Sequence, residues 1–329
     1  MPCSQKTIAF EKAAVLFNIG ALYTQIGARQ DRGSEEGLDE AVDKFMRAAG
    51  LFEFIRENFN NAPSSDLEPD CLKMLVQLML SQARECLFEK MVLSLGDGDD
   101  LDSCLDLSQE SAHISTSYEE VLRAMVETRV KQCVPYYWLC LVQIKREHYR
   151  ALADYYVALG LVTQQEDLSD RSVKTLQHIH DLQQLGESER PAVPRTAEQR
   201  KHLGDCLQDK DSIITFIFTG KAHLRESLLL HEEALRLNRM CPELRNKDIL
   251  KSVLKQHHER SLAIYQDIDD EDDFQVNVSG NTMSFLHIHN LPGSPGATLH
   301  SPLHHLPAVP LLPRLLQPPS DRSLPLAGT

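Results

Sequence analysis

The sequence predicts an all-α protein, and three observations point to this fold class. Apolar residues recur at spacings of three and four from about residue 8 to residue 268, which is the period of amphipathic helices. Segments rich in Pro, Gly, Asn and Asp separate the periodic stretches, and these residue types interrupt helices. Small residues stand at regular places among the apolar ones, where they allow two helices to approach closely. We therefore expect residues 8–273 to form one helical domain.

The first two helices are predicted at about 8–28 and 37–59. Their small and aromatic residues are Gly20, Tyr23 and Gly27 in the first helix, and Ala41, Phe45 and Ala48 in the second. This spacing is typical of a tetratricopeptide hairpin, in which two antiparallel helices pack closely. Four aromatic side chains are expected to pack between the two helices, namely Phe17, Tyr23, Phe45 and Phe52.

The same period predicts helices over most of the remaining domain. Their expected ranges are 69–93, 101–132, 135–162 and 169–185, with long helices over about 196–266. Pro69 and Pro135 fit the first turns of two of them, because that position needs no backbone N–H. The segment from Ile213 to Thr219 is β-branched and aromatic, so its local preference for strand conflicts with its helical surroundings.

Residues 274–329 are predicted to be a disordered, Pro-rich tail. Nine of the sixteen prolines of the chain follow residue 274, charged residues are rare there, and no helical period is present. The stretch 307–314 resembles a polyproline ligand, but its arginine stands one position earlier than such ligands require. A tail without a ligand is therefore the preferred interpretation.

The net charge of −14 disfavours nucleic acid and anionic membrane surfaces as partners, because both need clustered Lys and Arg. No run of about 18 apolar residues is present, so no integral membrane association is expected. The eight cysteines are scattered without a Cys-x-x-Cys pair, which predicts reduced thiols. These features predict a cytoplasmic protein, with peripheral association at endosomes or the actin cytoskeleton left open.

Catalytic, cofactor and metal sites are not predicted. Histidine pairs occur at residues 178 and 180, 257 and 258, and 287 and 289, but none has a Cys or carboxylate at ligand spacing. The acidic run at 267–273 lacks the glycine and the alternating ligands of a calcium loop. No nucleophile elbow and no Gly-rich phosphate loop is found. We expect a protein that is not an enzyme and that needs no cofactor.

The segment 10–26 resembles the signature helix of the Bro domain, the banana-shaped helical domain of Alix and the rhophilins. Further matches are Glu36-Gly37-Leu38, Arg56-Glu57-Asn58-Phe59, Met74 to Met79 and Phe88-Glu89-Lys90. The chain resembles the rhophilin family most over residues 8–93, more loosely to residue 165, and again over 254–273. The resemblance implies a Bro-type helical domain with a protein-binding surface.

The resemblance also shows what differs from the family. Rhophilins carry a Rho-binding coiled coil and a PDZ domain, and Bro domains have a further segment ahead of the signature helix. This chain contains none of these, so we expect a shortened form that lacks the amino-terminal part of the domain, with an insertion at 213–219. The implied function is a non-catalytic scaffold in Rho GTPase-linked signalling, with Rho-pathway proteins as partners and with direct Rho binding absent or weak. A truncated product without independent function is a further alternative.

The resemblance suggests one candidate surface. Alix and similar proteins hold an amphipathic helix of an endosomal-sorting (ESCRT) filament subunit on a concave apolar patch. Leu87 matches an apolar residue of that patch, whereas Asp102 and Asp106 replace two others and Asp39 replaces a basic residue. Glu35 is the fifth residue of the candidate partner-binding surface. Because unpaired carboxylates resist burial against an apolar helix, the role of an ESCRT adaptor is the alternative function.

Overall fold

The computed structural model describes residues 8–59, 65–95, 100–127, 130–131, 134–163, 168–185, 213–277 and 306–308. The α-helices of this part of the chain are α1 (Ile8–Ala28), α2 (Glu35–Asn58), α3 (Pro69–Leu95), α4 (Leu101–Val126), α5 (Tyr136–Thr163), α6 (Asp170–Leu185), α8 (Ile213–Met240) and α9 (Asp248–Asn277). A short 3-10 helix, η1 (Ser65–Leu67), precedes α3. The prediction of an all-α protein is confirmed for these residues.

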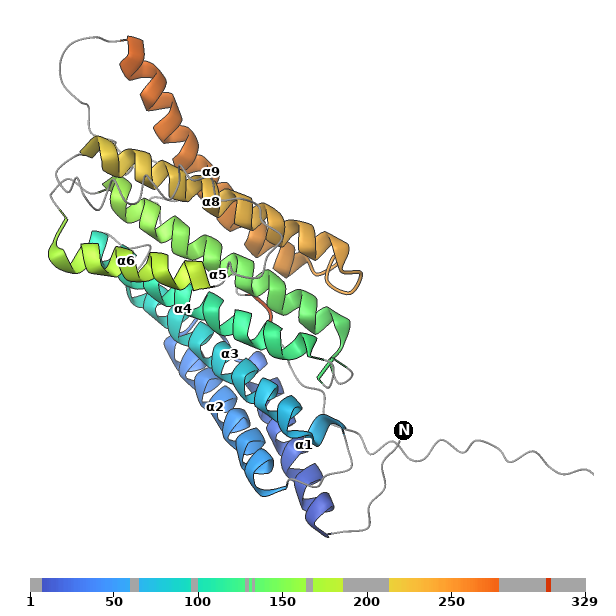
Figure 1. Ribbon diagram of the computed structural model, residues 1–329. Helices are drawn as coiled ribbons and strands as arrows, with labels where there is room; N and C mark the ends of the chain where they lie inside the picture. Colours follow the sequence, from blue (N-terminus) through green and yellow to red (C-terminus); the bar gives the residue numbers. More distant parts are fainter. Residues whose placement is uncertain are drawn as a thin grey trace, which may run out of the picture.

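The helices form a stacked array in which each one packs mainly on its neighbours in the chain (Figure 1). The array begins with α1 and α2 and ends with α8 and α9, while α6 lies against α4. Helix α5 is the central element, since it packs on α4 and on α8 and is buried on nearly every face from Cys140 to Val162. None of the helices in the described ranges is long and apolar enough to cross a membrane.

The packing between α1 and α2 confirms the expected hairpin. The rings of Phe17 and Phe52 lie 5.3 Å apart between their centroids, and Phe45 is buried beside them. A Cβ added at Gly20 would lie 2.7 Å from the Phe52 ring, so a larger residue there would force this buried ring to shift. Tyr23 is partly buried against the same cluster. The spacing of small and aromatic residues therefore reports a real contact between two helices.

Helix α4 ends earlier than its apolar period indicates, and the prediction that it extends to residue 132 is wrong. It ends at Val126, because Glu127 adopts an extended backbone with φ −60° and ψ 142°. The chain then turns, and Val130 is buried in the core. The burial of Val130 from outside the helix explains why an apolar residue continues the periodic pattern without continuing the helix.

The segment from Ile213 to Thr219 forms the first turns of α8 rather than a strand. Phe216 is buried there, and a Cβ added at Gly220 would lie 2.6 Å from the Val162 side chain of α5. Burial of this face against α5 thus overrides the local preference for strand. The predicted helical residues 196–212 lie outside the described residues.

The predicted tail lies mostly outside the described residues as well. Helix α9 continues to Asn277, four residues beyond the expected boundary at residue 273. Farther on, the structure describes only Leu306, Pro307 and Ala308, and Leu306 is buried.

Candidate partner-binding surface

The candidate residues lie on three adjacent helices around Leu87. The Leu87 side chain is on α3 and is 46% exposed. Asp39 of α2 binds Lys90, one turn beyond Leu87, with both carboxylate oxygens at 2.7 and 2.8 Å from Nζ. Glu35 stands one turn before Asp39 at the exposed start of α2. These two carboxylates therefore border Leu87 on the side of α2.

Asp102 and Asp106 border the surface from α4. Adjacent helices α3 and α4 are linked by an ion pair between Arg84 and Glu110. Arg84 precedes Leu87 by one turn and Glu110 follows Asp106 by one turn. Because the two helices run in opposite directions, this pairing places Leu87 and Asp106 at similar heights.

The carboxylates of α4 are not free, which corrects the premise that they are unpaired. Arg171 of α6 places Nη2 at 3.2 Å from Asp106 and Nη1 at 3.8 Å from Asp102. Ser172 also donates a hydrogen bond to Asp102 at 3.3 Å. Both carboxylates remain about half exposed, so the pairing moderates their cost at an interface without removing it.

Two further exposed leucines of α3 accompany Leu87, and they were not predicted from the sequence. Leu80 and Leu95 are also exposed, and their spacings of seven and eight residues from Leu87 place the three side chains on the same side of the helix. We call Leu80, Leu87 and Leu95 the leucine ridge. The helical spacing of these leucines was readable in the sequence, but α3 is apolar on most faces, so no single stripe could be identified as exposed. The ridge is an apolar strip flanked by the ion pairs that connect α3 to α2 and α4.

A group of buried charges lies within the domain beside this surface. Lys145 of α5 is fully buried and contacts Glu85 of α3, with Nζ at 2.6 and 2.9 Å from its oxygens. Arg32 donates to Glu85 at 3.1 Å and to Glu89 at 2.6 Å, and Tyr118 donates to Glu85. Burial opposes ionisation of Glu85, yet Lys145 and Arg32 hold its pKa below the ordinary value. We call these five residues the charged cluster.

The charged cluster holds three helices and the α1–α2 connection together. Its two cations and two carboxylates balance, so the arrangement avoids an isolated buried charge. Its members are paired with one another in a site closed to solvent, and this arrangement favours a structural role over catalysis. The helical period does not predict the charged cluster, because most of its members are far apart in sequence.

A second buried group is formed by His148 of α5, His231 of α8 and His257 of α9, which we call the histidine cluster. Nδ1 of His148 lies 3.3 Å from Nε2 of His231, and the rings of His148 and His257 lie 5.0 Å apart. Burial lowers the pKa of each of the three, for His257 to about 3. Among the described residues, no group of three His, Cys, Asp or Glu side chains has the geometry to hold a metal ion.

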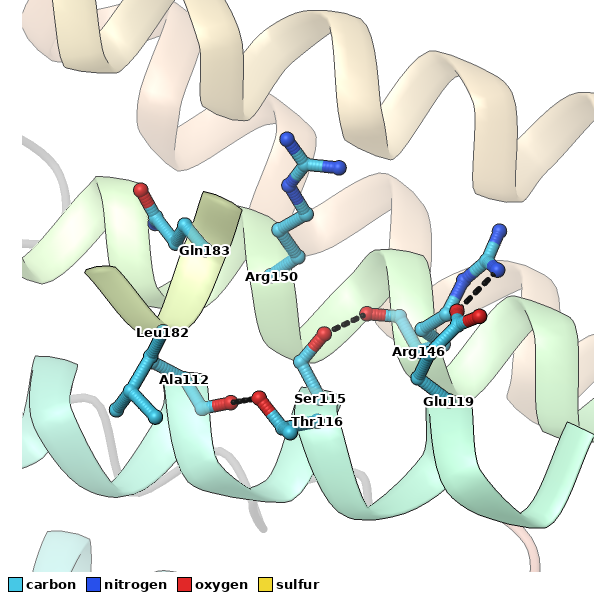
Figure 2. A pocket seen from close by; sticks show the side chains of 8 residues that line it. All are labelled: Ala112, Ser115, Thr116, Glu119, Arg146, Arg150, Leu182 and Gln183. Atoms are coloured by element: carbon cyan, nitrogen blue, oxygen red, sulfur yellow. Dashed lines mark hydrogen bonds and ion pairs between the residues drawn. The ribbon is translucent and has the colours of Figure 1, made fainter. Parts of the chain in front are cut away.

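A small cavity opens between α4, α5 and α6, and Figure 2 shows its lining. Its volume of about 20 Å³ is suited to a water molecule and is too small for a metabolite. Its polar groups largely bond to each other: Ser115 donates to the Arg146 carbonyl at 3.1 Å, and Arg146 binds Glu119 at 2.6 Å. The cavity therefore offers no substrate site.

The cysteines described by the structure give no sign of a nucleophile. Cys71, Cys86, Cys104, Cys140 and Cys241 are all buried thiols outside any disulfide. Burial raises the pKa of Cys86 to about 12 and that of Cys241 to about 11. Because a thiolate is the reactive form, these groups are suited to packing rather than to catalysis.

Comparison with known proteins assigns the family. The model of the BRO1-like domain matches residues 1–275. Human Rhophilin-1 is 41% identical over 280 residues, which cover 83% of this chain and 39% of the relative. Rhophilin-2-B of Xenopus laevis is 39% identical over 274 residues, covering 83% of this chain and 38% of the relative. The chain thus spans about two-fifths of the length of these relatives.

A solved chain described as "ALIX BRO1 CHMP4C complex" is 20% identical, with a TM-score of 0.43 over 63% of this chain and 56% of that one. The sequence matches extend over the whole helical array and include the surface around Leu87. They agree with the fold described above and with the resemblance seen in the first helices. This chain belongs to the BRO1-like domain family, and its similarity to Rhophilin-1 and Rhophilin-2-B supports a place in the rhophilin family.

Proposed function

We propose that this chain is a non-catalytic protein-interaction scaffold of the rhophilin type that acts in Rho GTPase-linked signalling. The similarity to rhophilins over 83% of the chain supports this proposal. The single observation that carries the interaction role is the leucine ridge on α3. A cytoplasmic location, peripheral to endosomes or actin, belongs to the same proposal.

The leucine ridge has the composition of a protein interface. Its three side chains are each about 40% exposed, and side chains on both flanks are engaged in ion pairs. An apolar strip with a polar rim is the usual anatomy of a binding patch. A strip of apolar side chains spaced seven and eight residues apart along one helix fits a partner helix that presents apolar residues at i, i+3, i+4 and i+7.

The proposal is tested by capture of partners on the full chain and on two matched variants. Leu87→Asp places a charge on the ridge. Leu229→Asp is the control, because Leu229 lies on α8 and has a similar exposure of 44%. We expect Rho-pathway proteins to be retained by the unaltered chain and the control and lost from Leu87→Asp. Identical sets of proteins on all three would refute the ridge as the binding surface.

Direct Rho binding is tested separately, because the resemblance to the rhophilins implies Rho binding through a coiled coil rather than through the helical array. Titration of the full chain with GTP-loaded Rho should show no saturation at micromolar concentrations. A micromolar or tighter Kd would contradict this expectation and would identify a Rho site on the helical array. In that case the Leu87→Asp variant distinguishes a site on the ridge from one elsewhere.

The alternative function is that of an ESCRT adaptor which binds an amphipathic helix of a filament subunit. The leucine ridge favours this alternative, and so does the pairing of Asp102 and Asp106 with Arg171, since a paired carboxylate is less costly to bury. Titration with that helical peptide discriminates between the alternatives. Tight binding by the unaltered chain, abolished by Leu87→Asp but not by Leu229→Asp, would make the adaptor role the leading one. A chain that captures neither class of partner would support a product without independent function.

A further inference from the structure

The described part of the tail is seated in the hydrophobic core. The side chain of Leu306 is 2% exposed and belongs to the buried cluster of the helical array, and Ala308 is partly buried against that cluster. In Figure 1 this short red segment lies near the middle of the array, well away from the carboxyl end of α9. The match to the BRO1-like domain ends at residue 275, so the segment is not part of the matched domain.

Arg32, between α1 and α2, holds the segment by its backbone. Its Nη1 donates a hydrogen bond to the Leu306 carbonyl at 3.1 Å, while Nε donates to Glu89 and Nη2 donates to Glu85. The two carboxylates of α3 neutralise the guanidinium, and Glu85 also contacts Lys145. A neutral carbonyl is therefore a better third acceptor for Arg32 than another anion would be. Arg32 is therefore suited to bind the carbonyl of a peptide backbone.

The sequence Leu-Pro suits this site for a physical reason. The peptide bond between Leu306 and Pro307 has no N–H, so its burial leaves only one polar group to satisfy, the carbonyl bound by Arg32. Proline also biases the preceding residue toward an extended backbone, which lowers the entropy lost on docking. The Leu306 side chain adds apolar burial. Leu-Pro occurs in this chain only in the tail, at residues 291, 306, 312 and 324.

We propose that the region around Arg32, Glu85 and Glu89 is a binding site for an extended Leu-Pro-Ala segment, and that residues 306–308 occupy it within the same molecule. We call it the Arg32 site. The stretch 278–305 can span on the order of 90 Å when extended, so it is long enough to connect α9 to the site. Tethering supplies an effective concentration on the order of 1 mM, so a weak contact suffices for occupancy.

Docking has a consequence for the proline-rich stretch 307–314. Pro307 is its first proline and is adjacent to the buried Leu306. A protein that binds extended proline-rich segments needs access to that backbone. Occupancy of the Arg32 site therefore withholds the backbone at Pro307 and Ala308 from such a partner until the segment is released.

The test uses the full chain and a labelled peptide with the sequence of residues 301–312. The tail variant Leu306→Asp should leave the Arg32 site open, whereas Leu324→Asp, at another Leu-Pro of the tail, is the matched control. We expect the peptide to bind Leu306→Asp about tenfold more tightly than the unaltered chain or the control, because a tethered segment at about 1 mM competes with it. A peptide carrying Leu306→Asp should not bind.

A variant of the site provides an independent check. The substitution Arg32→Lys is made in the chain that also carries Leu306→Asp. It keeps a positive charge between Glu85 and Glu89, but it removes the planar guanidinium that can also reach a peptide carbonyl. It should fold, by circular dichroism, and lose the peptide. If it fails to fold, the peptide variant still decides the question.

Three results would overturn the proposal. Equal peptide binding by the unaltered chain and Leu306→Asp would mean that the tail does not fill the site, and binding by neither would mean that the site does not recognise this segment. A dimer that dissociates in Leu306→Asp, observed by sedimentation, would assign the tail to a second copy. None of these results bears on the leucine ridge, so failure here is distinguishable from failure of the proposed scaffold function.

Discussion

Helix α5 contributes one residue to each of two buried polar groups. The protein accommodates these two groups in different ways. Toward α3 and α4, Lys145 belongs to the charged cluster, in which cations and carboxylates neutralise one another. Toward α8 and α9, His148 belongs to the histidine cluster, in which burial favours uncharged rings. The two residues stand one turn apart on α5, so the same helix supports both solutions.

The comparison teaches that the two groups should differ in their sensitivity to mutation and to pH. A balanced set of buried charges is sensitive to loss of a partner, because the remaining charge has no route to water. A set of neutral histidines tolerates loss of one ring better, but protonation of any of them introduces a buried charge. Four experiments test this contrast.

The largest effect is expected from Glu85→Gln. The change leaves the fully buried Lys145 and part of the charge of Arg32 without a carboxylate, which typically costs about 3–5 kcal/mol. Urea unfolding monitored by circular dichroism measures the loss. Glu110→Gln is the control, because its ion pair with Arg84 is partly exposed and should be worth less than about 1 kcal/mol. Equal losses in both variants would contradict the role given to the charged cluster.

An apolar site gives the second comparison. Phe45 is buried between α1 and α2, and Phe45→Ala should cost about 3–5 kcal/mol through lost burial and a residual cavity. No titratable group is involved, so the loss should be the same at pH 7 and at pH 5. A thermal midpoint unchanged by Phe45→Ala would mean that the α1–α2 hairpin is assigned incorrectly.

Phe45 and Glu85 also show how far the sequence predicted the fold. The α1–α2 hairpin was predictable because Gly20, Phe45 and their neighbours contact residues of the same or the next helix. The pairing of Glu85 with Lys145 joins residues 60 positions apart, and both stand inside helical patterns where a charged residue is usually read as exposed. Helix periodicity finds which residues share a face, but it does not find the partner of that face.

The candidate surface illustrates the same limit. Leu87 lies on the surface, and Asp39 and Asp106 lie near it, on neighbouring helices. The partner of Asp106 is Arg171, which α6 supplies from 65 positions away. Because sequence alone did not place α6 against α4, the carboxylates looked unpaired.

The third prediction concerns acid. Burial lowers the pKa of His257 to about 3, whereas an unfolded histidine titrates near 6.5. Below about pH 6.5 the unfolded chain therefore binds a proton that the folded chain does not, and stability falls by up to about 1.4 kcal/mol per pH unit for each such histidine. The pKa of Glu85 is lowered from 4.5, so its contribution is present above that pH and is lost only below it. Acid should weaken the histidine cluster first.

The measurement is the free energy of unfolding between pH 7 and pH 5. In the variant His257→Gln, the dependence on pH should be flatter by about 1 kcal/mol per pH unit than in the unaltered chain. His178→Gln, at an exposed histidine of α6, is the matched control. Hydrogen exchange at pH 5 should rise in α8 and α9 before it rises in α3. Uniform loosening of all helices would contradict the separation of the two clusters.

The smallest effect on stability is expected at the exposed carboxylates of α4. Asp102→Leu combined with Asp106→Leu breaks contacts with Arg171 that are about half exposed, and such pairs contribute about 0–1 kcal/mol. The effect on binding should be larger, because the substitutions remove charges that an apolar helix must desolvate beside Leu87. We expect the unaltered chain to bind the ESCRT filament helix poorly and the double variant to bind it more tightly in a titration of that peptide. The buried ion pair of Lys145 and Glu85 would then determine stability, whereas the exposed ion pairs of Arg171 would determine partner choice. Tight binding by the unaltered chain, with no gain in the double variant, would show that Arg171 already neutralises the carboxylates for a partner.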